Sequence, residues 1–148
     1  MKQSFRNYLC TERTRGLSRI LLVDDDVMDL EYYCKLLQNQ GHEVVPCASN
    51  GAALRLLDSE GFDFVVVSQG GPEFEGRSVA ERAMKEDRHT PVLVVSNSVD
   101  MDVYIEAMQL GAVDYLQKPV NPSEMTQVIR THLRPPKIAV GSGSANRA

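Results

Sequence analysis

Several short apolar runs of this chain end in polar side chains that could take part in chemistry. The first run ends in three consecutive aspartates, and later runs end in Ser68, Ser96 and Lys118. Carboxylates that converge on one edge of a protein repel each other unless a cation neutralises them, and Mg²⁺ prefers such oxygen ligands. We therefore expect Asp24 and Asp25 to face a hard cation. Lys118 would add a fixed positive charge there, and the hydroxyl of Ser96 would donate to an anion.

The third aspartate of the triplet, Asp26, has a simpler structural interpretation. An acidic side chain that precedes a helix accepts hydrogen bonds from the first turn and interacts favourably with the positive end of the helix dipole. We assign this capping role to Asp26 and keep Asp24 and Asp25 for the site, because a lysine is expected across the cleft from them.

The elements that position these residues alternate between two hydrophobic periods. Short β-branched runs suit strands buried on both faces of a parallel sheet, and each is followed by apolar residues at helical spacing. The predicted strands are residues 20–23, 43–47, 62–67, 92–95 and 112–116, and Asn50 is expected to cap the second helix. Five such units with right-handed crossovers predict a doubly wound α/β domain, whose site lies at the carboxyl ends of the strands.

Three segments carry a resemblance to a known family. The runs 20–26 (ILLVDDD), 91–96 (PVLVVS) and 111–119 (GAVDYLQKP) resemble the receiver domain of bacterial two-component response regulators. The resemblance covers residues 19–134 and implies a flavodoxin-like (βα)5 fold with a five-stranded parallel sheet in the order 2-1-3-4-5. Such domains accept a phosphoryl group from a histidine kinase onto an aspartate at the end of the third strand.

The resemblance also implies roles for individual residues. Asp24 and Asp25 match the positions that bind Mg²⁺, and Ser96 matches the hydroxyl that contacts the phosphoryl group. Tyr115 matches the aromatic switch. Lys118 matches the lysine that pairs with the phosphorylated aspartate, and the bond before the following Pro119 is often cis in the family.

The chain departs from the family at the phosphoacceptor. Pro72 and Gly76 match the family's loop without a gap, and this register puts Ser68 at the acceptor position. Asp63 cannot replace the acceptor, because it lies five residues earlier, about 16 Å away along an extended strand. Glu75 matches a later acid of the family's loop.

This substitution changes the expected chemistry. A serine hydroxyl needs an adjacent general base to act as a nucleophile, and His42, His89 and His132 fall away from the predicted site edge. Ser68 also removes one anionic metal ligand, so we expect weak Mg²⁺ binding at best and no required cofactor. Lys118 is then expected to pair directly with Asp24 or Asp25 in a permanently neutralised site.

We interpret the chain as a receiver-like signalling module that is not phosphorylated on aspartate and acts by protein–protein contact, without enzymatic activity. Its partner would be a histidine kinase or a downstream regulator. One alternative is a working phosphoacceptor that uses another residue, or Ser68 modified by a Ser/Thr kinase. Direct DNA binding is a weaker alternative, because 14 residues follow Arg134 and a separate folded domain needs roughly 50.

Charge and composition limit the remaining possibilities. The net charge of −4 argues against a nucleic-acid-binding face over the whole domain, although residues 1–18 form a basic arm. We expect that arm to be a solvated, flexible segment rather than a contact for an acidic partner, and we expect a flexible tail at 135–148. We expect Cys10, Cys34 and Cys47 to be free thiols in a reducing cytoplasm. No apolar run of the sequence is long enough to span a membrane.

The resemblance places the signalling surface at residues 101–110, 112–117 and 122–133. In the first of these segments we expect Ile105 and Met108 to point inward. Val103 and Tyr104 would then lie on the outer side, where tyrosine is a favoured interface residue. We predict that this face forms a homodimer or contacts a partner without phosphorylation.

Overall fold

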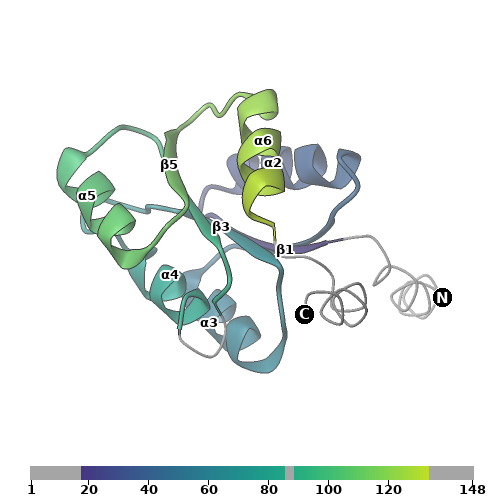
Figure 1. Ribbon diagram of the computed structural model, residues 1–148, viewed down its shortest axis with the longest axis horizontal. Helices are drawn as coiled ribbons and strands as arrows, with labels where there is room; N and C mark the ends of the chain where they lie inside the picture. The colour runs from purple at the N-terminus through teal and green to yellow at the C-terminus, as the bar shows by residue number, and fades with distance from the viewer. Residues whose placement is uncertain (1–17, 86–88, 134–148) are drawn as a thin grey trace, which may run out of the picture.

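The sheet has the predicted topology. A computed structural model describes residues 18–85 and 89–133, in which five parallel strands lie in the order β2-β1-β3-β4-β5 (Figure 1). The strands are β1 (Arg19–Val23), β2 (Glu43–Cys47), β3 (Phe64–Ser68), β4 (Val92–Ser96) and β5 (Asp114–Gln117). The helices are α2 (Val27–Asn39), α3 (Asn50–Ser59), α4 (Arg77–Ala83), α5 (Met101–Leu110) and α6 (Pro122–His132). The fold is therefore the flavodoxin-like doubly wound α/β sandwich.

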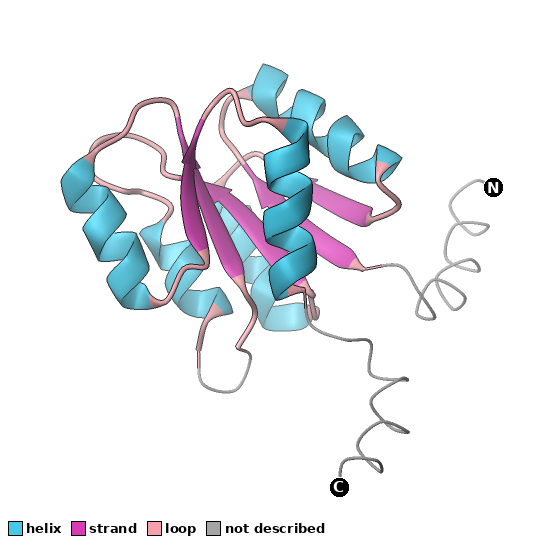
Figure 2. Ribbon diagram, turned by 45° about the horizontal axis from the view of Figure 1, so that its top comes forward, coloured by secondary structure: helices cyan, strands magenta, loops and turns pink. Residues whose placement is uncertain are grey.

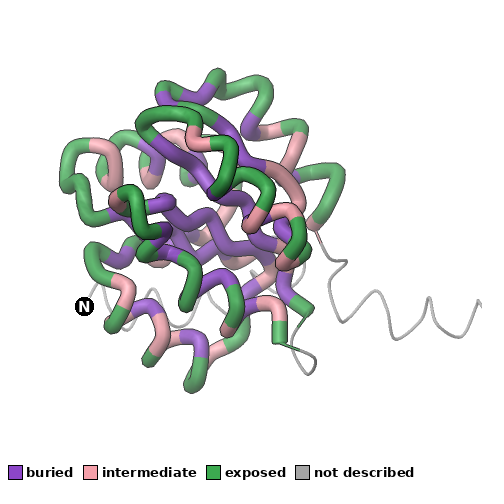
Figure 3. The backbone as a smooth tube through the Cα atoms, turned by 90° about the vertical axis from the view of Figure 1, so that its left-hand side faces the viewer, coloured by how far each residue is buried: buried purple, intermediate pink, exposed green. Residues whose placement is uncertain are grey.

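Alternate residues of the strands pack into two separate cores, because successive side chains of a strand point to opposite faces of the sheet. Leu21, Val65 and Val94 belong to the core under α3, α4 and α5. Ile20, Val66 and Val95 belong to the core under α2 and α6. Figure 2 shows the helices on both sides of the magenta sheet, and Figure 3 shows buried strands inside an exposed outer layer.

The central strands are buried along their whole length. Every residue of β3 and β4 is buried, and the five β3 residues include a run of three valines. Continuous apolar strands of this kind have no solvent-facing side, so their register is fixed by the helices on both faces. Their carboxyl ends are the points at which the chain emerges from the core, and Ser68 and Ser96 stand there as the last residue of each strand.

The predicted boundaries need correction in four strands and at one helix cap, and β1 and β4 are each one residue longer than predicted. The third strand begins two residues later than predicted and includes Ser68, and the fifth strand is Asp114–Gln117. Helix α3 is capped by Ser49, whose side chain accepts a hydrogen bond from the Ala52 N–H at 3.1 Å, and Asn50 is already inside the helix. Both residue types are good N-caps, so the sequence alone does not separate adjacent candidates.

The predicted orientation of α5 is wrong for Val103 and Ile105, whereas Met108 packs against the core as predicted. Val103 is buried at 4% exposure and packs with Ala107 against the sheet, whereas Ile105 is 47% exposed. These two inward residues are four apart, one helical turn, and the small Ala107 side chain lets the helix lie close to the strands. Val103 is therefore a core residue and not an interface residue, while Tyr104 is exposed at 37%.

Some sequence-based expectations concern segments that the structure does not describe. The arm at 1–18, apart from its last residue, and the tail at 135–148 lie outside the described residues, as does Cys10. Across the described ranges, no helix is long and apolar enough to cross a membrane.

Candidate functional site

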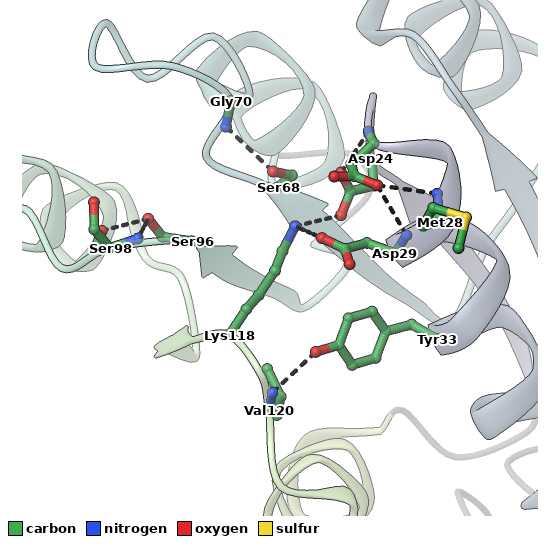
Figure 4. Close-up of polar contacts among 11 residues, drawn as sticks. Asp24, Met28, Asp29, Tyr33, Ser68, Gly70, Ser96, Ser98, Lys118 and Val120 are labelled. Carbon is green, nitrogen blue, oxygen red and sulfur yellow. Dashed lines mark hydrogen bonds and ion pairs between the residues drawn. The ribbon is translucent and has the colours of Figure 1, made fainter.

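The carboxyl ends of the strands bring most of the predicted site residues to one edge of the sheet. Figure 4 shows Asp24 after β1, Ser68 at the end of β3, Ser96 at the end of β4 and Lys118 after β5. Asp24, Ser68, Ser96 and Lys118 are all buried polar residues, each at most 9% exposed. Buried polar groups have to be paired to be tolerated, so the contacts of each one define the state of the site.

The dominant contact is an ion pair made by Lys118. Its Nζ lies 2.7 Å from Asp24 Oδ2 and 2.8 Å from Asp29 Oδ2. The other oxygen of Asp24, Oδ1, accepts a hydrogen bond from the Asp26 N–H at 3.0 Å. The predicted pairing of Lys118 with Asp24 is thus confirmed. The ammonium group of Lys118 binds the carboxylates of both Asp24 and Asp29 (Figure 4).

Asp29 is the site residue that sequence reasoning missed. It lies in the first turn of α2, where an acidic residue is also explained as a favourable partner of the helix N-terminus. Its carboxylate instead reaches the buried lysine, because α2 starts directly beside β1 and its first turn overhangs the strand ends. No local sequence signal identifies this role, because the contact depends on how α2 lies over the strand ends.

The two carboxylates determine the charge state of the lysine. Burial by itself lowers the pKa of Lys118, because it disfavours the charged ammonium group. Hydrogen bonds and charge attraction from Asp24 and Asp29 outweigh this effect, so the pKa of Lys118 lies above its usual value. At neutral pH the site therefore holds a charged lysine against two acidic side chains.

The other two aspartates of the triplet face solvent. The Asp26 carboxylate caps α2 by accepting hydrogen bonds from the N–H groups of Met28 and Asp29 at 3.0 and 3.1 Å, as predicted. Asp25 is exposed and lines a cleft with Asp24, Ser68 and Glu75. It is not among the ion-paired partners of Lys118.

Ser68 occupies the end of the central strand. Its Oγ accepts a hydrogen bond from the Gly70 N–H at 3.3 Å. Gly76 packs against the same residue so closely that a Cβ atom there would lie 2.2 Å from the Ser68 carbonyl oxygen. The backbone at Ser68 is therefore held by its own loop, and a side chain at position 76 would displace it.

The nearby acids do not replace a carboxylate at position 68. Asp63 lies before the opposite end of β3, where Oδ2 accepts a hydrogen bond from the Arg19 N–H at 2.8 Å. Glu75 accepts a hydrogen bond from the Gly71 N–H within the loop after β3. Each of these carboxylates has a local structural role.

None of the three histidines lies next to Ser68, where it could act as a general base. His42 precedes β2, His89 precedes β4, and His132 is the last residue of α6, so all three lie toward the amino ends of the strands. Cys34 and Cys47 are poor candidates for a reactive thiolate, because burial raises the pKa of both thiols. The hydroxyl of Ser68 thus has no activating partner of these types.

Ser96 turns its hydroxyl toward its own loop. The Oγ donates to the Ser98 carbonyl oxygen at 2.6 Å and lies 3.3 Å from the Ser98 N–H (Figure 4). Ser96 is only 4% exposed, and these contacts within the turn satisfy the hydrogen-bonding capacity of its buried hydroxyl.

Tyr115 is held inward by two hydrogen bonds. Its hydroxyl donates to Gln69 Oε1 at 2.6 Å and accepts from the Asp100 N–H at 3.2 Å. Tyr115 is 7% exposed and Gln69 5% exposed, so this contact is buried and connects the loops after β3 and β4 with β5. Sequence reasoning did not identify Gln69, because a glutamine after a strand carries no signal of its own.

The segment after Lys118 contacts α2 through its backbone. The Lys118–Pro119 bond is cis, as the resemblance led us to expect. The next residue, Val120, donates its backbone N–H to the hydroxyl of the buried Tyr33 at 2.9 Å (Figure 4). This contact attaches the end of β5 to α2, the helix that carries Asp29.

The site residues fit a divalent cation poorly. Among residues 18–85 and 89–133, no group of three acidic, cysteine or histidine side chains is placed to hold a metal ion. Asp24 already shares its two oxygens between Lys118 and a backbone N–H, and Ser68 offers a neutral hydroxyl. Mg²⁺ requires near-octahedral oxygen coordination, for which these residues supply few charged ligands.

Comparison with known proteins decides the family. The model of the response regulator receiver domain matches residues 20–130. The chain belongs to the response regulator receiver family. It is 32% identical over 126 residues to the positive alginate biosynthesis regulatory protein of Pseudomonas aeruginosa, covering 83% of this chain and 50% of that protein.

Other relatives agree with this assignment. The chain is 28% identical over 116 residues to the regulatory protein VanRc of Enterococcus gallinarum, covering 78% of this chain and 50% of the relative. A receiver domain protein from Methanospirillum hungatei has a similar structure, with a TM-score of 0.72, 29% identity, and coverage of 78% of this chain and 93% of its own. The chain thus spans about half of the length of these curated relatives.

The ion pair predicts a large and pH-dependent effect of Lys118→Met. The substitution leaves two carboxylates together, one of them at 3% exposure, and removing one partner of a buried pair costs about 3–5 kcal/mol. Urea denaturation at neutral pH should show this loss. Lys35→Met, in an exposed pair with Glu31, should change stability by less than about 1 kcal/mol.

The pH dependence has a definite sign. Because the pKa of Lys118 is raised on folding, its contribution is fully present below about 10.4, the usual value for lysine, and is lost as pH rises through the folded-state pKa. The stability difference between wild type and Lys118→Met should therefore shrink at alkaline pH. An equally small effect for Lys118→Met and Lys35→Met would contradict the pairing.

Proposed function

We propose that this two-component receiver domain transmits its signal by protein–protein contact and is not phosphorylated on an aspartate. Membership of the family implies a signalling partner such as a histidine kinase. The observation that carries the proposal is Ser68, which stands at the carboxyl end of the central strand with no carboxylate in its place. A neutral hydroxyl with no histidine beside it is a weaker nucleophile toward a phosphoryl donor than an ionised carboxylate.

The state of Lys118 supports the same proposal. In a receiver that is phosphorylated, the resemblance assigns this lysine to the modified acceptor. Here its ammonium group is within 2.8 Å of two carboxylates that are already present. The negative charge that the lysine requires is thus supplied by Asp24 and Asp29 rather than by a modification.

The buried tyrosine supports a signalling state that does not depend on an input at Ser68. Gln69 and the Asp100 N–H both bind the Tyr115 hydroxyl, so its inward position is stabilised by protein groups alone. The Tyr104 ring packs edge-on against Tyr115, with centroids 5.7 Å apart. The position of the buried tyrosine is therefore coupled to a side chain on the outer surface of α5.

The proposed contact surface includes the start of α5. Four large apolar side chains are exposed here, and three of them lie on the helix itself: Val99, Met101, Tyr104 and Ile105. Met101 and Ile105 are one turn apart and share a side of the helix. Apolar groups gathered in this way are typical of a protein–protein contact, and we propose a second copy of the chain or a signalling partner as the occupant.

We propose no enzymatic activity and no required cofactor for the domain, with Mg²⁺ bound weakly at best. The donor set supports this, since Asp25 is the exposed acid of the triplet and Asp24 is engaged by Lys118. Phosphorylation of Ser68 by a Ser/Thr kinase is the competing function, and it is separated from the proposal by the first experiment below.

The wild-type protein should not respond to phosphoryl donors or their mimics. With Mg²⁺ and beryllofluoride, its amide NMR spectrum should stay unchanged, and incubation with acetyl phosphate should add no phosphoryl mass. Ser68→Asp should restore at least metal-induced shifts around Asp24 and Asp25, because a carboxylate at the end of β3 would then join these two acids in the cleft that Glu75 also lines.

Ser78→Asp is the matched control, because it adds the same acid at an exposed position of α4 and should restore nothing. Stoichiometric labelling of the wild type by acetyl phosphate would overturn the proposal. Labelling of Ser68 in protein isolated from growing cells would favour the kinase alternative instead.

The α5 surface predicts self-association that a charge should abolish. In sedimentation equilibrium the wild type should show a mass that rises with concentration toward a dimer, and Tyr104→Glu and Ile105→Glu should each remain monomeric. The reason is that a buried carboxylate in an apolar contact must be desolvated without a partner.

Gln38→Glu, an exposed change on α2 away from the α5 surface, is the control and should associate like the wild type. Ile105→Glu guards against a folding defect in Tyr104→Glu, whose ring contacts Tyr115. A wild type that stays monomeric at every concentration would exclude the dimer and leave the signalling partner as occupant. Unchanged dimers in both variants would exclude this surface.

A further inference from the structure

A second exposed apolar patch lies on α2, away from the α5 surface. It consists of Val27, Met28 and Tyr32, which are 65%, 75% and 53% exposed. Met28 and Tyr32 are one helical turn apart and therefore share a side of the helix. Tyr32 is also held by an edge-on contact with the buried Tyr33, with ring centroids 4.9 Å apart, so the patch is partly pre-organised.

The surroundings of the patch are acidic. Asp25 and Asp26 are exposed and immediately precede Val27, and the exposed Glu31 on the next turn is paired with the exposed Lys35. Asp26 uses its carboxylate to cap the helix and still faces solvent. A segment that covers this region should therefore combine apolar or aromatic side chains with positive charge.

Residues 1–17 of the same chain have this composition. They contain four Lys or Arg residues against one Glu, whereas the whole chain carries a net charge of −4. Phe5, Tyr8 and Leu9 lie between the basic positions. The tail at 134–148 is also basic but contains no aromatic residue, so it matches the patch less well.

The geometry allows the segment to reach the patch. Residues 1–17 lead directly into β1, and α2 runs back from the carboxyl end of β1 to its amino end (Figure 1). The 13 residues of α2 span about 20 Å. An extended segment of 17 residues spans about 56 Å, which is more than the length of the helix.

We propose that residues 1–17 dock within the same molecule on the patch formed by Val27, Met28 and Tyr32, with their basic side chains toward Asp25 and Asp26. Because the segment is covalently attached, weak contacts suffice, since tethering gives an effective concentration of about millimolar. The docked segment would compete with any partner that approaches this end of α2. The proposal does not depend on whether Ser68 is modified.

The test uses a nitroxide label on Cys10 of the full chain, with Cys34→Ser and Cys47→Ala to leave one thiol. Amide NMR signals of α2 from Val27 to Tyr32 should lose most of their intensity and recover when the nitroxide is reduced. Signals of α5 should keep their intensity. Added salt should weaken the effect, because the contact is partly electrostatic. If the substituted chain does not fold, the native chain can be labelled at Cys10, since burial raises the pKa of Cys34 and Cys47.

Two further samples decide where and how the segment binds. Met28→Lys with Tyr32→Lys should abolish the intensity loss on α2, and Gln109→Lys, an exposed change on α5, should leave it intact. A second sample mixes nitroxide-labelled protein that contains no ¹⁵N with ¹⁵N-enriched protein that carries no nitroxide. This mixture should show no loss of signal intensity. Intensity loss in that mixture would assign the patch to a second copy and overturn intramolecular docking. No loss on α2 in any sample, or loss that persists in the Met28→Lys, Tyr32→Lys chain, would overturn the proposal as well.

Discussion

Lys118 carries a positive charge into a region where it is 8% exposed, and it is stable there because Asp24 and Asp29 lie within hydrogen-bonding distance. Much of the strand-end edge is organised around this group. Asp24 must follow β1, Asp29 must lie on the first turn of α2, and the segment after β5 must aim the lysine at both. An unpaired charge in this position would cost several kcal/mol, so the three elements are energetically linked.

The two apolar cores place these charged groups with little freedom. Strands buried on both faces end at defined points, and the polar residues that follow them have only the edge of the sheet to occupy. The Val120 N–H bound to the Tyr33 hydroxyl adds a direct connection between β5 and α2. The proposed loss of aspartyl phosphorylation fits this arrangement, since the lysine is neutralised by side chains that belong to the fold.

The fold and the main ion pair could be predicted from sequence because both follow from strong local patterns. Five apolar strands, an aspartate triplet after the first and a lysine after the last define the sheet edge and its opposite charges. Asp29 and Gln69 could not be found in this way, because their roles depend on how α2 and the loop after β3 lie in space. Val103 was placed on the wrong side of α5, because several overlapping apolar spacings were available and packing against the sheet selected the one that contains Ala107.

We propose that Asp24 and Asp29 neutralise Lys118 without a metal ion or a phosphoryl group. The most direct measurement is NMR of the ¹⁵N-labelled lysine ammonium groups, titrated with pH and then with Mg²⁺. We expect Lys118 to give a protected ammonium signal with a pKa above the usual lysine value, and we expect Mg²⁺ to leave this signal in place. A Lys118 signal with the pKa of an exposed lysine, or one displaced by Mg²⁺ at millimolar concentration, would contradict it.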